Sequence, residues 1–187
     1  MSFGSSKWQE YEKLINRISL SIRENAVSHA YIIEGDALTD KMGFAIDFLK
    51  AVSCNELPGT GCDECLTCRK IEHRNYEDLY IVEAEFNASK TAKSIRDDAI
   101  EELQDNLARK AVEERCFAII ESADSMTHRA QNRLLKTLEE PNPGTVIILL
   151  WVMRNKRLYQ WQFIDKLSIS GISVEVILGG INEISKS

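Results

Sequence analysis

Four cysteines lie close together in the sequence and have the chemistry of a metal site. They follow the spacing C-x7-C-x2-C-x2-C and are Cys54, Cys62, Cys65 and Cys68. Zinc is commonly bound by four thiolates in a tetrahedron, and a C-x2-C turn presents two sulfurs to one ion. We therefore predict a structural Zn²⁺ site in an insert over residues 53–75, which we call the cysteine module. Two alternatives stay open: an iron–sulfur cluster, which uses similar ligands, and four unpaired thiols.

A second candidate site follows an apolar run, in the stretch EGDALTDKMG (34–43). A working phosphate loop has the pattern G-x-x-x-x-G-K-[ST], in which backbone N–H groups and the lysine bind phosphate and the hydroxyl holds Mg²⁺. Gly35 and Lys41 match this pattern, whereas Asp40 replaces the second glycine and Met42 replaces the hydroxyl residue. A carboxylate repels phosphate and a thioether does not hold magnesium. We therefore predict a degenerate nucleotide loop.

A matching change occurs after the apolar run CFAII (116–120), where the chain continues with Glu121 and Ser122. An ATPase with a phosphate loop would have two acidic residues here, one for magnesium and one that activates water. Ser122 takes the place of the water-activating glutamate. Because both sites are altered, we predict that the chain is not an enzyme on its own and needs no ATP as a cofactor. Weak nucleotide binding stays open.

Two arginines belong to a helix that is predicted just after this second site. In the stretch THRAQNRLLKTLEEP (127–141), the apolar residues form one stripe at helical spacing, and Thr127 is placed as the N-cap. Pro141 ends the helix. Arg129 and Arg133 fall outside the apolar stripe. Either they form a solvated surface, or one of them contacts DNA phosphate or a neighbouring subunit.

Alternating strands and helices must position these residues. Apolar runs predict strands over 29–35, 79–83, 116–120 and 146–150. Helical spacing of apolar residues predicts helices over 7–27, 41–52, 94–110 and 128–140. The cysteine module has the composition of a loop. This alternation is typical of an α/β fold in which a mostly parallel sheet is covered by helices on both faces, in three layers.

The composition is that of an ordinary globular protein. Apolar residues make up 44% of the 187 residues and charged residues 28%. We expect a cytoplasmic protein, since there is no apolar signal segment and no apolar run long enough to span a membrane. The net charge of −6 argues against a protein that coats nucleic acid by itself. In such a compartment clustered cysteines favour a metal over disulfides, and the separate Cys116 is expected in the core.

The chain resembles the ATPase-like (AAA+) domain of bacterial clamp-loader subunits, which belong to the DNA polymerase III holoenzyme. The residues that carry the resemblance are His29-Ala30-Tyr31, the four-cysteine insert, Ile95-Arg96, and above all CFAIIESADSMTHRAQNRLLKTLEEPNPGTVIILL (116–150). The resemblance covers about residues 7–150. It implies a P-loop NTPase (AAA+) domain over residues 1–150, with the cysteine module inserted in it.

Within this family, gamma/tau subunits keep an intact phosphate loop. Delta-prime subunits share the fold and the zinc module but have commonly lost residues of the ATP site. Asp40, Met42 and Ser122 therefore place the chain with the delta-prime branch. The resemblance then implies a non-catalytic subunit that helps to load the sliding clamp on DNA during replication. Its partners would be gamma/tau and delta subunits in a hetero-oligomeric ring, and primed DNA indirectly.

Two other functions stay open, an active ATPase of the gamma/tau kind and a zinc-stabilised adaptor of the same fold that acts outside replication. The sequence also leaves the family pattern after Leu150. Family members continue with a Leu-Pro-x-x-x-x-Ser-Arg-Cys run, whose arginine completes a neighbour's ATP site, and residues 151–167 do not match it. We interpret 151–187 as a divergent tail that reflects truncation or an altered reading frame, and we expect no such arginine here. Residues 168–180 would form a strand only if Gly171 interrupts it.

Overall fold

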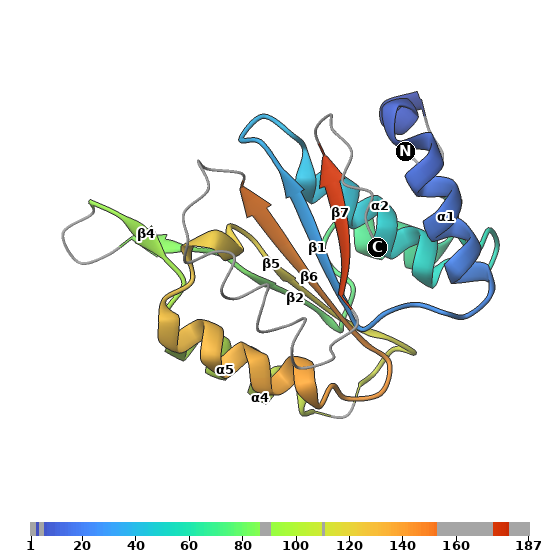
Figure 1. The fold of residues 1–187 in the computed structure, drawn as a ribbon. Helices are drawn as coiled ribbons and strands as arrows, with labels where there is room; N and C mark the ends of the chain where they lie inside the picture. Colours follow the sequence, from blue (N-terminus) through green and yellow to red (C-terminus); the bar gives the residue numbers. More distant parts are fainter. Residues whose placement is uncertain (1–2, 4–5, 87–90, 110, 153–173, 180–187) are drawn as a thin grey trace.

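A five-stranded parallel sheet lies at the centre of the molecule (Figure 1). The computed structural model describes Phe3 and residues 6–86, 91–109, 111–152 and 174–179. The strand order is β2-β5-β6-β1-β7, and each neighbouring pair is parallel, which confirms the predicted type of sheet. The strands are β1 (Ala30–Gly35), β2 (Leu79–Val82), β5 (Cys116–Ile120), β6 (Thr145–Val152) and β7 (Val174–Gly179).

Helices cover both faces of the sheet (Figure 1). One face packs against α1 (Glu12–Arg23) and α2 (Lys41–Ser53), and the other against α4 (Asp97–Leu107) and α5 (His128–Glu139). The predicted three-layer α/β architecture is therefore confirmed. Among the described residues, no helix has both the length and the apolar composition needed to cross a bilayer.

Alternate residues of the central strands belong to two separate cores. Tyr31 and Ile148 pack in the core that contains α1 and α2, whereas Ile32 and Ile147 pack in the core that contains α4 and α5. Every residue of β5 is buried, because a strand covered on both faces has no solvent-facing side. Cys116, at the start of β5, is buried as predicted, and this burial raises the pKa of its thiol to about 11.

The N-terminal helix differs from its prediction as one helix over 7–27. It consists of a 3₁₀ segment, η1 (Ser6–Tyr11), followed by α1, which ends at Arg23. Trp8 has non-helical backbone angles (φ −110°, ψ 21°), and its buried indole N–H donates to the carboxylate of Asp47 on α2 at 2.8 Å. The tryptophan therefore interrupts the helix at the point where it enters the core.

The cysteine module and the region after β2 contain elements that apolar periodicity did not reveal. The module holds a short helix, α3 (Leu66–Glu72), where a loop was predicted. This helix starts because the Cys65 sulfur accepts a hydrogen bond from the Cys68 N–H and so caps it. A two-stranded antiparallel ribbon of β3 (Glu85–Phe86) and β4 (Lys93–Ser94) follows β2 and projects beyond the sheet (Figure 1). Both strands are too short to give a recognisable alternation.

Strand β7 comes from the segment 151–187, the predicted divergent tail. It pairs with β1, with Ala30 opposite Val174 and Gly35 opposite Gly179. The strand begins C-terminal to Gly171, so this glycine does not have to interrupt it. Residues 153–173 and 180–187 lie outside the described residues, and the interpretation of the tail as truncated or frame-altered therefore stays a prediction.

Candidate metal centre and phosphate loop

The four cysteines of the module converge in space. Their sulfur atoms all lie within 4.8 Å of one another, with Cys54 Sγ 4.0 Å from Cys65 Sγ and Cys62 Sγ 3.9 Å from Cys68 Sγ. A tetrahedral site with Zn–S bonds of about 2.3 Å requires sulfur–sulfur distances of ~3.8 Å. The donor set therefore fits a divalent metal of this kind. The predicted convergence of the four residues is confirmed, whereas the identity of the metal is not established.

Backbone N–H groups point at the sulfurs. The N–H of Leu57 donates to Cys54 Sγ at 3.3 Å, and the N–H of Cys65 donates to Cys62 Sγ at 3.3 Å. The bond from Cys65 is the main reason why the pKa of Cys62 falls to about 7. Burial instead raises the pKa values of Cys65 and Cys68. Without a metal these two sulfurs would stay protonated at neutral pH, and a bound dication would make their ionisation favourable.

Three adjoining pieces of backbone position the ligands. Cys54 caps the C-terminus of α2, Cys65 caps the N-terminus of α3, and Cys68 lies in the first turn of α3. Between them the chain turns through Gly59 and Gly61, whose φ angles are 82° and 81°. A Cβ atom on Gly59 would lie only 2.8 Å from the backbone oxygen of Ser19 on α1, so the loop approaches α1 closely at this glycine. The positive φ angles of the two glycines thus allow the turn that lies between Cys54 and the other cysteines.

The phosphate-loop stretch connects the carboxyl end of β1 to α2, where ligands commonly bind in parallel sheets. Charged side chains of this loop bind groups of the loop itself. Lys41 is buried, and its ammonium group donates to the backbone oxygens of Asp36 and Thr39. Burial lowers the pKa of Lys41, while the carboxylates of Asp36, Asp124 and Glu121 oppose this effect. Asp36 in turn accepts hydrogen bonds from Leu38 and Thr39, which close the turn.

Asp40 is the N-cap of α2, and its carboxylate accepts a hydrogen bond from the first turn of this helix. One of its oxygens accepts a hydrogen bond from the N–H of Gly43 at 2.9 Å, and the other pairs with the ammonium of Lys7 at 2.8 Å. The bond from Lys7 is the largest cause that lowers the pKa of Asp40, so the group is ionised at neutral pH. The helix N-terminus, which attracts anions, thus has an internal anion bound to it. Met42, on the first turn, packs against the core that contains α1 and α2.

The end of β5 lies at the same edge of the sheet as this loop. Glu121 follows β5 directly, and Ser122 adopts a left-handed backbone conformation (φ 56°, ψ 46°). Asp124 accepts a hydrogen bond from the N–H of Val152 at the end of β6. Glu121 and Asp124 are both close enough to Lys41 to raise its pKa. The sheet therefore brings together Lys41, the predicted Glu121 and the unpredicted Asp124.

Two acidic residues of this site were missed from sequence. The D-x-x-T spacing of Asp36 and Thr39 is a local turn signal that could have been recognised. Asp124 carries no comparable signal, since its hydrogen bond from the N–H of Val152 is a tertiary contact with β6.

The two arginines of α5 differ in their surroundings. The guanidinium of Arg133 forms two parallel 2.8 Å contacts with Asp97 on α4 and lies 3.3 Å from Glu101. Arg133 is thus part of a contact between two helices of the same chain. Arg129 is exposed on α5. Of the two, only Arg129 leaves its charge available for another molecule, and its predicted contact with DNA or a subunit stays a prediction.

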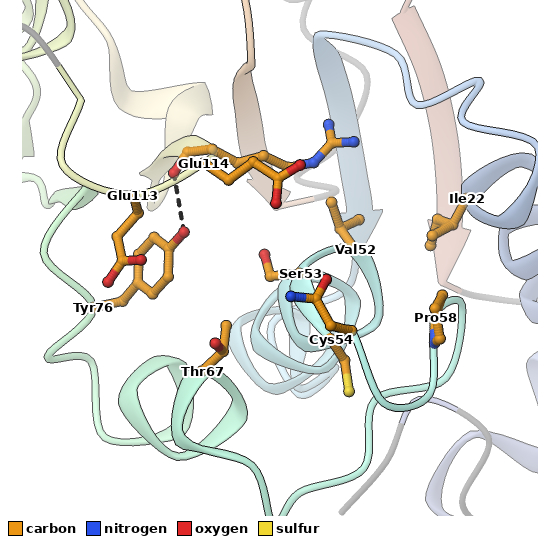
Figure 2. A pocket seen from close by; sticks show the side chains of 11 residues that line it. Ile22, Val52, Ser53, Cys54, Pro58, Thr67, Tyr76, Glu113 and Glu114 are labelled. Carbon is orange, nitrogen blue, oxygen red and sulfur yellow. Dashed lines mark hydrogen bonds between the residues drawn. The ribbon is translucent and has the colours of Figure 1, made fainter.

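A cavity of about 210 Å³ lies beside the cysteine module (Figure 2). Its walls come from the ends of α1 and α2, the cysteine loop, α3 and residues 113–115. Figure 2 shows Tyr76 in one wall, where its hydroxyl donates to the backbone oxygen of Arg115 at 3.2 Å. This cavity is on the cysteine side of α2, away from the α2 N-terminus where a phosphate loop would bind nucleotide.

Comparisons with known proteins agree on one family. The family model described as "DNA polymerase III, delta subunit" matches residues 10–159. DNA polymerase III subunit delta' of Bacillus subtilis is 34% identical over 148 residues, which is 76% of this chain and 43% of that protein. DNA polymerase III subunit tau/gamma of Haemophilus influenzae is 34% identical over 141 residues, which is 74% of this chain and 19% of that protein. The chain thus spans less than half the length of these relatives.

A solved structure extends the similarity to the fold. The DNA clamp loader delta protein of Bacillus subtilis superposes with a TM-score of 0.52 at 11% identity, over 88% of this chain and 42% of that one. At this identity the similarity concerns the fold alone.

Proposed function

The chain belongs to the DNA polymerase III delta-subunit family, and from this membership we propose that it is the ATPase-like domain of a non-catalytic, delta-prime-type subunit of a bacterial clamp loader. In this role it would help to load the sliding clamp on DNA during replication, in the cytoplasm. Its partners would be the gamma/tau and delta subunits of a hetero-oligomeric ring, and it would meet primed DNA only through that assembly.

One observation carries the non-catalytic part of the proposal: the carboxylate of Asp40 is bound at the N-terminus of α2. A phosphate group would need the same N–H groups and the same positive end of the helix dipole. Lys41 is turned toward backbone oxygens of its own loop. Nucleotide binding would therefore have to displace one internal anion and reorient a buried ammonium group.

We assign the metal at the cysteine module as zinc with a structural role. Cys54, Cys62, Cys65 and Cys68 would be its four ligands, which leaves no open position for a substrate. The ion would stabilise the fold of the module by crosslinking the end of α2, the cysteine loop and α3. Backbone N–H groups that donate to the sulfurs would further stabilise the thiolate ligands.

An active ATPase of the gamma/tau kind is the second candidate. It is favoured by the 34% identity to a tau/gamma subunit and by the position of Glu121 and Asp124 near Lys41. An acidic residue and a lysine at one edge of the sheet are what magnesium-dependent phosphoryl transfer requires. Against it, Ser122 replaces the residue that would activate water, and Met42 packs into a core instead of presenting a hydroxyl. An adaptor of the same fold outside replication is the third candidate.

Reconstitution with partner subunits separates these candidates. The full-length protein would be mixed with the gamma/tau and delta subunits of the same organism, and complexes would be separated by size-exclusion chromatography. We expect the protein to co-elute with gamma/tau. We also expect all ATP turnover of the complex to come from its gamma/tau subunits. Failure to associate with either subunit would refute the clamp-loader role and favour an adaptor. Mg²⁺-dependent ATP turnover by the isolated protein would favour the gamma/tau-type enzyme.

A further inference from the structure

A fully buried lysine lies between α2 and the cysteine module. Lys50 is 0% exposed although it is on the last turns of α2. Its ammonium lies 2.7 Å from Asp47, 2.8 Å from Asp63 and 2.6 Å from Glu72. Burial alone would lower the pKa of Lys50, but the bonds to these three carboxylates raise it above its ordinary value. The charge is therefore permanent at neutral pH and is compensated from three directions.

Two of the three carboxylates belong to the segments that carry the metal ligands. Asp63 follows Cys62 directly in the cysteine loop, and Glu72 ends α3, the helix that carries Cys68. The backbone of the same lysine also accepts a hydrogen bond from the N–H of Cys54 at 2.9 Å. Lys50 thus contacts the end of α2, the cysteine loop and α3, which carry Cys54, Cys62 and Cys68. The fourth ligand, Cys65, is instead bound to Cys62 through its own N–H.

The close packing around Lys50 fixes the loop as well. A Cβ atom added to Gly61 would lie 3.2 Å from Cβ of Lys50, so the glycine that precedes Cys62 rests directly on the stem of the lysine. Asp47, the third carboxylate, is bound on its other oxygen by the indole of Trp8. The ammonium therefore connects the cysteine module, through Asp47, to the buried Trp8 of the core.

The charges explain why this connection matters for a metal. A dication with four thiolate ligands is a dianion, and the carboxylates of Asp63 and Glu72 add negative charge beside it. Without Lys50, the carboxylates of Asp63, Glu72 and the buried Asp47 would lose the ammonium group that now lies between them. The cysteine loop and α3 would then be held less firmly against α2, and the four sulfurs would be less well positioned as ligands.

We propose that Lys50 is a positioning residue of the metal site, which holds the cysteine loop through Asp63 and α3 through Glu72 and thereby sets the affinity for the metal. The inference does not depend on the clamp-loader role, because it concerns only the cysteine module and α2. Residues outside the ligand shell of metal sites typically change metal affinity by about 10–100-fold when they are mutated.

The test measures metal affinity in Lys50→Met and in a matched control. Lys70→Met removes another lysine of the module, on α3, whose ammonium binds Glu77 and Glu113 instead of the cysteine loop. Co²⁺ would be titrated into the reduced, metal-free protein and followed by its thiolate charge-transfer absorption, and Zn²⁺ affinity would be obtained by competition with a chromophoric chelator. We expect Lys50→Met to bind at least about tenfold more weakly, and Lys70→Met to stay within about threefold of the unmodified protein. Equal affinity of Lys50→Met and the unmodified protein, or equal weakening in both variants, would overturn the proposal.

A second pair of variants covers the case in which Lys50→Met does not fold. Asp63→Asn and Glu72→Gln change side chains that are 33% and 50% exposed, so that the core is left intact. Each variant also removes a negative charge near a dianionic centre. A purely electrostatic influence would therefore strengthen metal binding, whereas loss of positioning weakens it. Weaker Co²⁺ and Zn²⁺ binding in both variants supports the proposal, and unchanged or tighter binding contradicts it.

Discussion

At the scale of single residues, charged side chains of the predicted phosphate loop are bound within the chain itself. Asp40 accepts the N–H of Gly43 and pairs with Lys7, so its carboxylate takes the place that a phosphate would occupy at the N-terminus of α2. The ammonium group of Lys41 donates hydrogen bonds to backbone oxygens of the same loop. The loop therefore holds this conformation through its own side chains, which supports the proposal that the chain has no ATPase activity of its own.

The first prediction reverses these changes. The double variant Asp40→Gly, Met42→Thr removes the internal anion and supplies the hydroxyl that a working loop uses for magnesium. We expect measurable binding of Mg-ATP by isothermal titration calorimetry in the double variant, under conditions where the unmodified protein gives no saturable heat. Met42→Thr alone is the control, and it should remain silent because Asp40 is still in place. If the double variant does not bind either, the carboxylate is not what excludes nucleotide.

A second prediction concerns the N-cap of α5. The hydroxyl of Thr127 accepts a hydrogen bond from the N–H of Ala130, and Thr127→Ala would leave this N–H without its partner. The free energy of unfolding should fall by about 1 kcal/mol, as measured by urea denaturation. Thr127→Ser keeps the acceptor and should recover most of the loss. An alanine variant as stable as the unmodified protein would show that the cap contributes nothing.

Local chemistry made several of these residues predictable. Thr127 was identified as a cap because its side chain acts on the helix that it precedes, and the four cysteines because their spacing is short. Asp124 was missed because it enters the site through a hydrogen bond from Val152, and the Lys7–Asp40 pair because its partners are far apart in sequence. The partner of Arg133 was missed for the same reason: Asp97 belongs to another helix.

At the scale of elements, the cysteine module is a small unit attached to α2. It contains one short helix, α3, which is capped by Cys65 and carries Cys68. A helix of this length is not stable by itself in water. Its stability must come from tertiary contacts. Ile71 packs in the core that contains α1 and α2, Lys50 binds the last residue of the helix, Glu72, and a bound metal would add its ligand bonds.

Metal removal should therefore unfold the module while the sheet persists. We predict one equivalent of zinc in the gently purified, reduced protein and loss of protection from proteolysis between residues 54 and 72 after chelation. Cys62→Ser with Cys65→Ser should retain no metal. Cys116→Ala, which changes the buried cysteine of β5, should retain a full equivalent. Iron in place of zinc would identify a cluster instead, and the absence of any metal would leave four thiols.

The contact between α4 and α5 gives a pH-dependent prediction. The guanidinium of Arg133 holds the pKa of Asp97 below its usual range. The resulting stabilisation is present above the ordinary pKa of aspartate, about 4, and is lost as the pH falls through the lower pKa of the folded state. Arg133→Ala should thus lower the urea midpoint at pH 7 and have little effect at pH 2. Lys136→Ala, an exposed change on the same helix, serves as the control and should have little effect at either pH. A difference that persists undiminished at pH 2 would rule out this ion pair as its source.

The elements themselves were predicted unevenly. Strands β1, β5 and β6 were found because burial on both faces makes them largely apolar. The N-terminal helix was extended too far, because periodicity does not register that Trp8 turns into the core to reach Asp47. The β3–β4 ribbon and α3 are short, and hydrogen bonds rather than apolar patterns define them.

At the scale of the whole molecule, the parallel sheet brings the predicted nucleotide loop and the end of β5 to one edge, and the cysteine module lies at the other end of α2. Strand β7 completes the sheet beside β1 although it follows β6 by a long segment. The chain spans less than half the length of its delta-prime and tau/gamma relatives. Arg129, exposed on α5, is available for a contact in such an assembly.

The most direct test of the account is titration of Mg-ATP into the zinc-loaded protein, with ATP turnover measured on the same sample. We predict neither saturable binding nor turnover, because Asp40 occupies the N-terminus of α2 and Lys41 is bound to its own loop. Saturable binding accompanied by Mg²⁺-dependent hydrolysis would contradict the account and would assign the chain to the gamma/tau-type enzymes.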